Sequence, residues 1–153
     1  MNSAPATRRS GSLKYSLTIG IAAMEGRGFY FPCDTAVGKD GLLYTANRSV
    51  DIEHRGVRVT AYDLESEYYG TFGSYGEGDG QFISPTGVAV DSLGRVYLSD
   101  EYTHRISVFE SQGAFLARWG VHGDRPGELD SPSGIALDGD DNLCLADDFL
   151  HRI

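Results

Sequence analysis

Two histidines stand at equivalent places in the chain, each four residues after an aspartate. His104 follows Asp100, and His151 follows Asp147. Imidazole and carboxylate groups are ligands for zinc and other transition metals, so this spacing raises the question of a metal ring. Both pairs belong to the same turn of an internal repeat, and we therefore interpret these histidines as structural. The remaining two histidines have no counterparts and are expected in exposed loops: His54 and His122.

Two other segments resemble a phosphate-binding loop and a calcium-binding loop, but each lacks a residue that such a loop needs. The glycine-rich segment 73–80 lacks the Gly-Lys-Ser/Thr ending of a phosphate-binding loop, and its Glu77 and Asp79 would repel phosphate. The acidic segment 138–142 begins like a calcium loop, but Leu143 occupies the sixth position, where that loop needs glycine. We interpret the first segment as a connector between sheets and the second as a hairpin turn.

Composition limits the classes of function. The 153 residues carry 22 acidic and 13 basic side chains, a net charge of −9, which argues against RNA binding because phosphate contacts need clustered Lys and Arg. Cys33 and Cys144 match neither a metal cluster nor a disulfide framework. No signal peptide or membrane-spanning stretch is evident. We therefore expect a cytoplasmic protein that contacts no membrane, with a disordered basic tail at residues 1–14.

An internal repeat decides the architecture. The segment 84–91, Ser-Pro-Thr-Gly-Val-Ala-Val-Asp, is matched 47 positions later by Ser-Pro-Ser-Gly-Ile-Ala-Leu-Asp at 131–138. The same offset of 47 positions holds without a gap for the whole segment 72–106, which matches 119–153. A looser copy lies 53 positions upstream, and the difference is a six-residue insertion within residues 49–56. Repeats of this length are typical of propeller blades.

Each repeat contains four short stretches rich in β-branched and aromatic residues, separated by turn residues. In the second copy we expect strands at 87–91, 95–100, 105–110 and 115–120. Four antiparallel strands per repeat make one blade of a β-propeller. The sequence thus predicts an all-β propeller segment of four-stranded blades in an incomplete ring. Its expected parts are an outer strand of a preceding blade at 15–20, blades at 31–73 and 84–120, and a truncated blade at 131–153.

The second copy resembles the NHL repeat, a blade type of propellers that usually have six blades. The residues that carry this resemblance are Phe72-Gly73, the Gly-Asp-Gly-Gln-Phe run at 78–82, Pro85 to Asp91, Gly94 to Tyr97 and His104 to Phe109. The first copy matches less closely, and the third matches as far as it extends. The resemblance covers residues 15–153. It indicates the fold far more specifically than the function, because propellers host many unrelated activities.

Several repeat positions have physical roles independent of the family. Glycine opens the innermost strand, where blades crowd together. An aspartate that ends a strand can accept backbone N–H groups of the following turn. The arginine that opens the third strand can reach a carboxylate on the adjacent strand. The structural positions are Pro32, Pro85, Gly87, Asp91, Asp100, Arg105, Pro132, Gly134, Asp138, Asp147 and Arg152.

The resemblance also implies alternatives among enzymes. Peptidyl-hydroxyglycine lyases with this fold hold zinc near the central tunnel through His residues that follow the proline of the inner strand. The corresponding residues are Cys33, Thr86 and Ser133, and none is histidine. We therefore assign no catalytic, cofactor or metal residue. A lyase-like or lactonase-like propeller enzyme remains the alternative, with zinc or calcium held by blades outside this chain.

Binding is the favoured class of function. Some NHL propellers are the substrate-recognition part of ubiquitin ligases and others bind RNA, and the acidic charge favours a protein partner here. The insertion within 49–56 lies in the loop after the second strand, on the face that carries the connectors. It is either a neutral decoration or part of a site. The residues expected to contact a partner are Asp51, Glu53, His54, Arg55, Tyr75, Glu77, Asp100, Tyr102, His104 and His122.

The length adds one more expectation. At 47 residues per blade the chain holds about three blades, whereas closed propellers have about four to eight. The sequence is therefore interpreted as part of a longer propeller. The alternative is a head-to-tail homodimer, in which each strand at 15–20 completes the other copy's unfinished blade.

Overall fold

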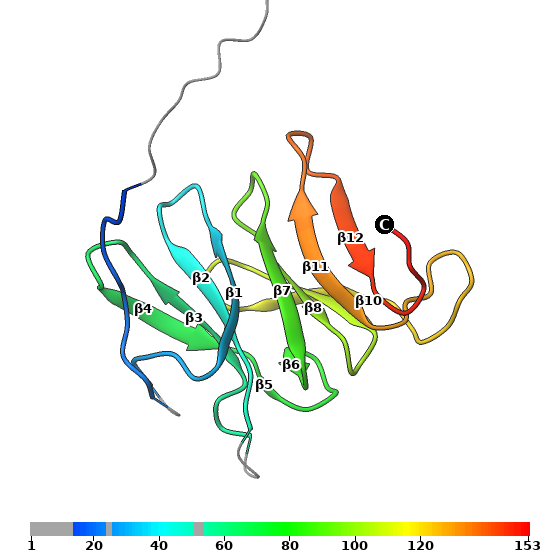
Figure 1. Ribbon diagram of the computed structural model, residues 1–153, viewed down its shortest axis with the longest axis horizontal. Helices are drawn as coiled ribbons and strands as arrows, with labels where there is room; N and C mark the ends of the chain where they lie inside the picture. Colours follow the sequence, from blue (N-terminus) through cyan, green and yellow to red (C-terminus); the bar gives the residue numbers. More distant parts are fainter. Residues whose placement is uncertain (1–13, 24–25, 51–53) are drawn as a thin grey trace, which may run out of the picture.

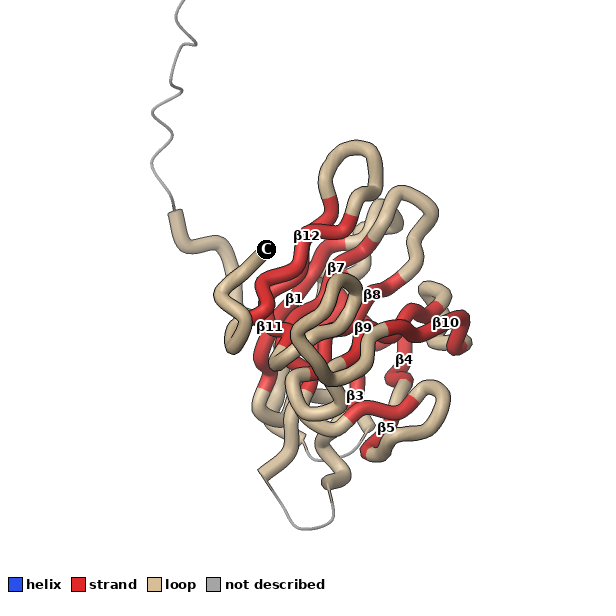
Figure 2. Tube along the Cα trace, turned by 90° about the vertical axis from the view of Figure 1, so that its right-hand side faces the viewer, coloured by secondary structure: helices blue, strands red, loops and turns tan. Residues whose placement is uncertain are grey.

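The computed structural model describes residues 14–23, 26–50 and 54–153. These ranges contain strands, turns and loops and no helix, which confirms the all-β prediction (Figure 2). Accordingly, no described segment is a helix long and apolar enough to cross a membrane.

The strands form two complete four-stranded antiparallel sheets and the first half of a third (Figure 1). In each sheet every strand pairs with the next one along the chain. The first sheet contains β1 (Pro32–Val37), β2 (Leu43–Asn47), β3 (Arg58–Tyr62) and β4 (Tyr68–Phe72). The second contains β7 (Pro85–Val90), β8 (Val96–Asp100), β9 (Arg105–Phe109) and β10 (Phe115–Trp119). The third contains β11 (Pro132–Leu137) and β12 (Leu143–Asp147).

The first strands of the three sheets lie side by side, with β7 between β1 and β11 (Figure 1). Equivalent side chains bond them to each other. The Cys33 thiol donates to the carbonyl oxygen of Pro85 at 3.2 Å, and the Thr86 hydroxyl donates to that of Pro132 at 2.8 Å. The sheets therefore meet at their inner strands and diverge outward, as blades of a propeller do.

The hydrophobic core fills the space between the first two blades. Its largest members are at most 1% exposed: Tyr44, Val59, Phe82, Leu98 and Phe109. Burial of large apolar side chains is the main favourable term in folding. The packing of one blade against the next therefore holds the segment together.

Glycine at the start of an inner strand is required where a neighbouring blade lies close. A Cβ built on Gly87 would lie 2.7 Å from the Ser133 carbonyl oxygen. At the equivalent Gly134 a Cβ would meet nothing within 4 Å among the described residues. In the first blade Asp34 fills this position, and its carboxylate accepts the Val88 N–H of the next blade at 2.9 Å.

The connectors between blades also repeat. The short strands β5 (Ser74–Tyr75) and β6 (Gln81–Phe82) pair in parallel. Isolated parallel bridges recur at the equivalent places, between His122 and Leu129 and between Ala22 and Phe29.

The prediction of an outer strand at 15–20 was wrong. This segment carries no strand pairing in the structure. The physical reason is that a strand needs a hydrogen-bonded neighbour, and no third strand of a preceding blade lies beside it among the described residues.

Candidate functional site

The loops expected to form a binding site gather at one end of the blades (Figure 1). We call this end the connector face; it comprises residues 48–50, 54–57, 73–84, 101–104, 120–131 and 148–151. The hairpins between the first two strands of each blade lie at the opposite end. Asp51 and Glu53, both expected to contact a partner, lie outside the described residues.

His54 and Tyr75 form a ring stack on the connector face. Their ring centroids are 3.8 Å apart and the ring planes differ by 7°. Both side chains, together with Arg55, line a cavity of about 450 Å³. The structure thus brings together three of the residues expected to contact a partner.

The side chain of Glu77 is exposed, whereas its backbone carbonyl takes part in hydrogen bonds that hold the connector. Its carbonyl oxygen accepts bonds from Arg105 Nη1 at 3.0 Å and from Arg118 Nη1 at 2.7 Å. Arg105 therefore holds the connector and does not make the expected contact with a carboxylate on the adjacent strand. A backbone carbonyl is a partner that no sequence pattern reveals.

Arg152 makes both contacts. Its Nη2 lies 3.3 Å from the Asp147 carboxylate, as expected, and its Nη1 donates to the carbonyl oxygen of Asp124 at 3.3 Å. Asp124 is the counterpart of Glu77 in the next connector. The arginine at this repeat position thus ties each connector to the blade that follows it.

Asp100 has a structural role. It is 2% exposed, and its carboxylate accepts four backbone N–H groups, from Ile83, Ser84, Tyr102 and Thr103. The turn contacts expected of this aspartate are therefore present, and the carboxylate also fastens the end of the connector. Because it is buried and fully engaged, Asp100 has no free surface to offer a partner.

A groove opens between the second and third blades. Tyr102 and Phe149 lie along it and are 63% and 71% exposed. Its volume is about 670 Å³. The other residues that line it are Ser84, Glu101, Ser131, Asp148 and His151.

His104 and His122 converge on Asp130. The Asp130 Oδ1 atom lies 3.6 Å from His104 Nδ1 and 3.4 Å from His122 Nε2, and the two imidazole centroids are 4.3 Å apart. The interpretation of His122 as a residue without a counterpart was wrong, since it occupies the place of Tyr75 in the next connector. The His104 ring packs against the His122 ring in a tilted arrangement, with 31° between the ring planes, whereas His54 stacks on Tyr75.

The residues at the positions of the lyase zinc ligands are engaged with backbone carbonyls. Besides the bonds between blades described above, the Cys33 thiol donates to Ala46 O at 3.3 Å. The Ser133 hydroxyl donates to Ala146 O at 3.2 Å and contacts the Asp148 carboxylate at 2.8 Å. These side chains link strands and blades.

The acidic segment 138–142 folds as a hairpin turn around its own backbone. The Asp138 carboxylate accepts the N–H groups of Asp140 and Asn142 and the Asn142 side-chain amide, each at 2.9 Å. These bonds, led by that of the Asn142 side chain, hold the pKa of Asp138 below its ordinary value.

Asp91 has the equivalent role in the hairpin of the second blade. Burial of its carboxyl opposes ionisation, but the bonds from Arg95, Leu93 and Tyr97 outweigh this and lower the pKa.

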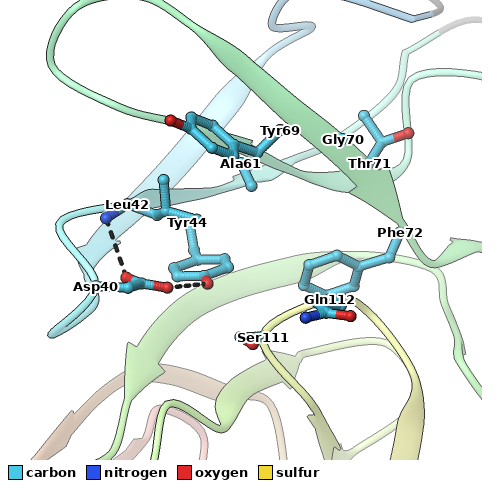
Figure 3. A pocket seen from close by; sticks show the side chains of 10 residues that line it. All are labelled: Asp40, Leu42, Tyr44, Ala61, Tyr69, Gly70, Thr71, Phe72, Ser111 and Gln112. Atoms are coloured by element: carbon cyan, nitrogen blue, oxygen red, sulfur yellow. Dashed lines mark hydrogen bonds between the residues drawn. The ribbon is translucent and has the colours of Figure 1, made fainter.

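A cavity of about 500 Å³ lies between the first blade and the β9–β10 turn of the second (Figure 3). The Tyr44 hydroxyl donates to Asp40 Oδ2 at 2.9 Å, and the Leu42 N–H donates to Asp40 Oδ1 at 3.0 Å. Burial, followed by the Asp40 bond, raises the pKa of Tyr44 to about 12. The tyrosine is therefore a fixed donor at neutral pH, and among the described residues Asp40 is the only carboxyl that lines this cavity.

Comparison with known proteins agrees with this geometry. Residues 82–109 match the family model of the NHL repeat. The chain carries an NHL repeat. No curated protein sequence matches it at a significant level.

Solved structures show the fold. The segment superimposes on virginiamycin B lyase from Staphylococcus aureus with a TM-score of 0.50 and 13% identity, covering 76% of this chain and 34% of that one. It superimposes on a gluconolactonase from Xanthomonas campestris with a TM-score of 0.52 and 21% identity, covering 77% of this chain and 35% of that one. Both are β-propellers. The chain thus spans about a third of the length of these propellers.

Proposed function

We propose that the chain is a non-catalytic NHL-type propeller scaffold that binds a partner protein through its connector face. The groove between the second and third blades is the docking point. The observation that carries this proposal is the pair of exposed aromatic side chains along the groove, Tyr102 at 63% and Phe149 at 71% exposure. Exposed aromatic residues beside a concavity are typical of the centres of protein interfaces.

The charge of the groove selects a cationic, apolar segment as its occupant. Its lining includes two carboxylates, Glu101 and Asp148, and no Lys or Arg. Arg48 lies 3.2 Å from Glu101 and balances it, whereas Asp148 makes no ion pair within the described part of the chain. A partner segment with a Lys or Arg next to aliphatic residues would pair with Asp148 while its apolar side chains cover Tyr102 and Phe149. The net charge of −9 would steer such a segment toward the protein.

Catalysis has less support from the described residues. Cys33 and Thr86, the side chains nearest in position to the lyase ligands, donate to backbone carbonyls between blades. The enzymes with similar structures share the fold at low identity, and their activities belong to those proteins.

The test measures binding of defined peptides to the full chain by fluorescence anisotropy. The probes are a labelled octapeptide of alternating Lys and Leu, its Glu-Leu counterpart and its Lys-Ser counterpart. We expect saturable binding of the Lys-Leu peptide alone, because both its charge and its apolar side chains are needed. Binding of the Glu-Leu peptide with equal affinity would overturn the proposed chemistry.

Matched variants locate the site. Tyr102→Ala and Phe149→Ala are expected to weaken binding of the Lys-Leu peptide at least about ten-fold, the range of interface anchors. Leu93→Ala is the control, because Leu93 is 76% exposed in the hairpin at the opposite end. Unchanged affinity in both aromatic variants would refute the groove as the docking point.

A further inference from the structure

We propose that His104, His122 and Asp130 form a binding site for a divalent transition metal, with zinc as the ion that their chemistry favours. One ligand atom of each residue lies within 4.8 Å of the other two. Two imidazole nitrogens and one carboxylate oxygen form a donor set that suits zinc better than calcium or magnesium, which prefer oxygen ligands alone. The site lies on the connector face, where the connector that precedes β11 meets the turn before β9.

The distances from Asp130 to the two imidazoles are close to those of tetrahedral coordination. Ligands about 2.0–2.1 Å from a tetrahedral zinc ion are separated by about 3.3 Å. Asp130 Oδ1 lies 3.4 Å from His122 Nε2 and 3.6 Å from His104 Nδ1, so small side-chain rotations bring both pairs to that separation. The His122 side chain is 65% exposed, which leaves an approach for the ion and room for water as a fourth ligand.

The surrounding structure holds two of the three ligands in place. The Asp130 backbone N–H donates to the buried Asp147 carboxylate at 3.0 Å, and its carbonyl oxygen accepts the Phe149 N–H at 3.3 Å. The His104 side chain is 23% exposed, and its Nδ1 accepts the Ser131 N–H at 3.1 Å. The Nδ1 lone pair is therefore the acceptor of this hydrogen bond. A bound metal would replace the Ser131 amide hydrogen at that lone pair.

The preceding connector, residues 73–84, packs without the metal-ligand set, so the repeat does not need His122 and Asp130 for its structure. There Val57, Tyr75 and Ile83 stand at the positions of His104, His122 and Asp130, and His54 of the insertion stacks on Tyr75 without a set of three ligands. Stacking on the connector therefore needs neither a second imidazole nor a carboxylate. His122 and Asp130 add two donors that the repeat itself does not require.

The experiment titrates the full chain with zinc by calorimetry, with a phosphine reductant to keep the cysteines reduced. We expect one saturable site in the unmodified protein. His122→Tyr and Asp130→Ile, which introduce the residues of the preceding connector, are expected to lower the zinc affinity at least about ten-fold, since each removes a ligand. His122→Ala provides a second test at an exposed position that tolerates truncation.

One control variant and two spectroscopic measurements make the result specific. Asp124→Ala removes an exposed carboxylate of the same connector, outside the cluster, and is expected to leave zinc affinity unchanged. Cobalt added in place of zinc should produce a visible absorption band that Asp130→Ile abolishes. The Ser131 amide NMR signal should shift on zinc addition, because it loses its acceptor.

The proposal is overturned if the unmodified protein shows no saturable zinc binding. It is equally overturned if His122→Tyr and Asp130→Ile bind zinc as tightly as the unmodified protein does. Loss of binding in Asp124→Ala alone would place the ion elsewhere. None of these outcomes depends on the peptide-binding groove, so the two proposals fail or succeed separately.

Discussion

Removing the Asp100 carboxylate tests how the connector is fastened to its blade. The change is Asp100→Ala. Four backbone N–H groups lose their acceptor, at donor–acceptor distances of 2.5 Å for Ile83, 3.2 Å for Ser84, 2.9 Å for Tyr102 and 3.1 Å for Thr103. The first two belong to the connector and the last two to the turn after β8.

The expected loss of folding free energy follows from where these donors lie. Tyr102 is exposed, so water can replace the carboxylate in the turn at small cost. The Ile83 and Ser84 amides lie between blades, and a covered donor without an acceptor costs about 1–3 kcal/mol. We therefore expect Asp100→Ala to lower the free energy of unfolding by about 3–5 kcal/mol, a large share of the stability of a small domain.

Asp100→Asn is the matched conservative variant. Its remaining oxygen can keep the three bonds that Oδ1 accepts, so only the Ile83 bond is lost, and we expect a cost of about 1–2 kcal/mol. The first blade already uses an amide at this position: Asn47 Oδ1 accepts the Tyr30 N–H at 3.0 Å. Asn is thus compatible with the same turn.

Urea unfolding measures these differences. The single tryptophan, Trp119 in β10, reports the transition by fluorescence, and the slope with urea must stay constant for the comparison to hold. Glu101→Ala is the control, since the exposed pair of Glu101 with Arg48 is worth less than about 1 kcal/mol. If Asp100→Ala costs no more than Glu101→Ala, the reasoning from the buried carboxylate is refuted.

Three further predictions concern the blade positions and the hairpin end. Gly87→Ala should lower the free energy of unfolding by about 1–3 kcal/mol, because its Cβ would lie 2.7 Å from Ser133 O. Gly134→Ala should change that free energy by no more than about 0.5 kcal/mol. Equal urea midpoints for the two variants would contradict this prediction. The pKa of Asp91 is lower folded than unfolded, so its stabilisation is present above the unfolded value of about 3.9 and is lost as pH falls through the folded value. Asp91→Asn should flatten the acid side of the plot of stability against pH, and an unchanged slope would count against it. Tyr44, with a pKa of about 12, should ionise last in an ultraviolet titration of the folded protein, and Tyr44→Phe should remove that final phase. Because the unfolded tyrosine ionises near about 10, Tyr44 stabilises the fold below that pH and loses this contribution as pH rises toward 12.

The blades themselves could be predicted from the sequence. The second copy places strands within about two residues of the observed β7, β8, β9 and β10, since turn residues and β-branched runs mark the boundaries of short strands. The outer strand at 15–20 could not be judged this way. Its residues resemble those of β4 and β10, but a strand exists only where a neighbour supplies hydrogen bonds.

The candidate site was predictable only in part. The repeat pattern located the connector face and the exposed Tyr75 and Tyr102. Phe149 and the Asp130 carboxylate were missed as site residues, because neither stands at a conspicuous spacing from the residues it joins. The one available signal for Asp130 was its departure from Ile83, the apolar residue at the equivalent repeat position.

By itself, the sequence determined the blade: its four strands, its turn aspartates and its glycine-opened inner strand are local features repeated along the chain. Only the tertiary structure decided which side chains meet. His104, His122 and Asp130 come from two different loops, and Arg105 finds a backbone carbonyl of the preceding connector. Such contacts depend on how neighbouring blades pack, and packing is set by the summed burial of many apolar residues. No short motif encodes that sum.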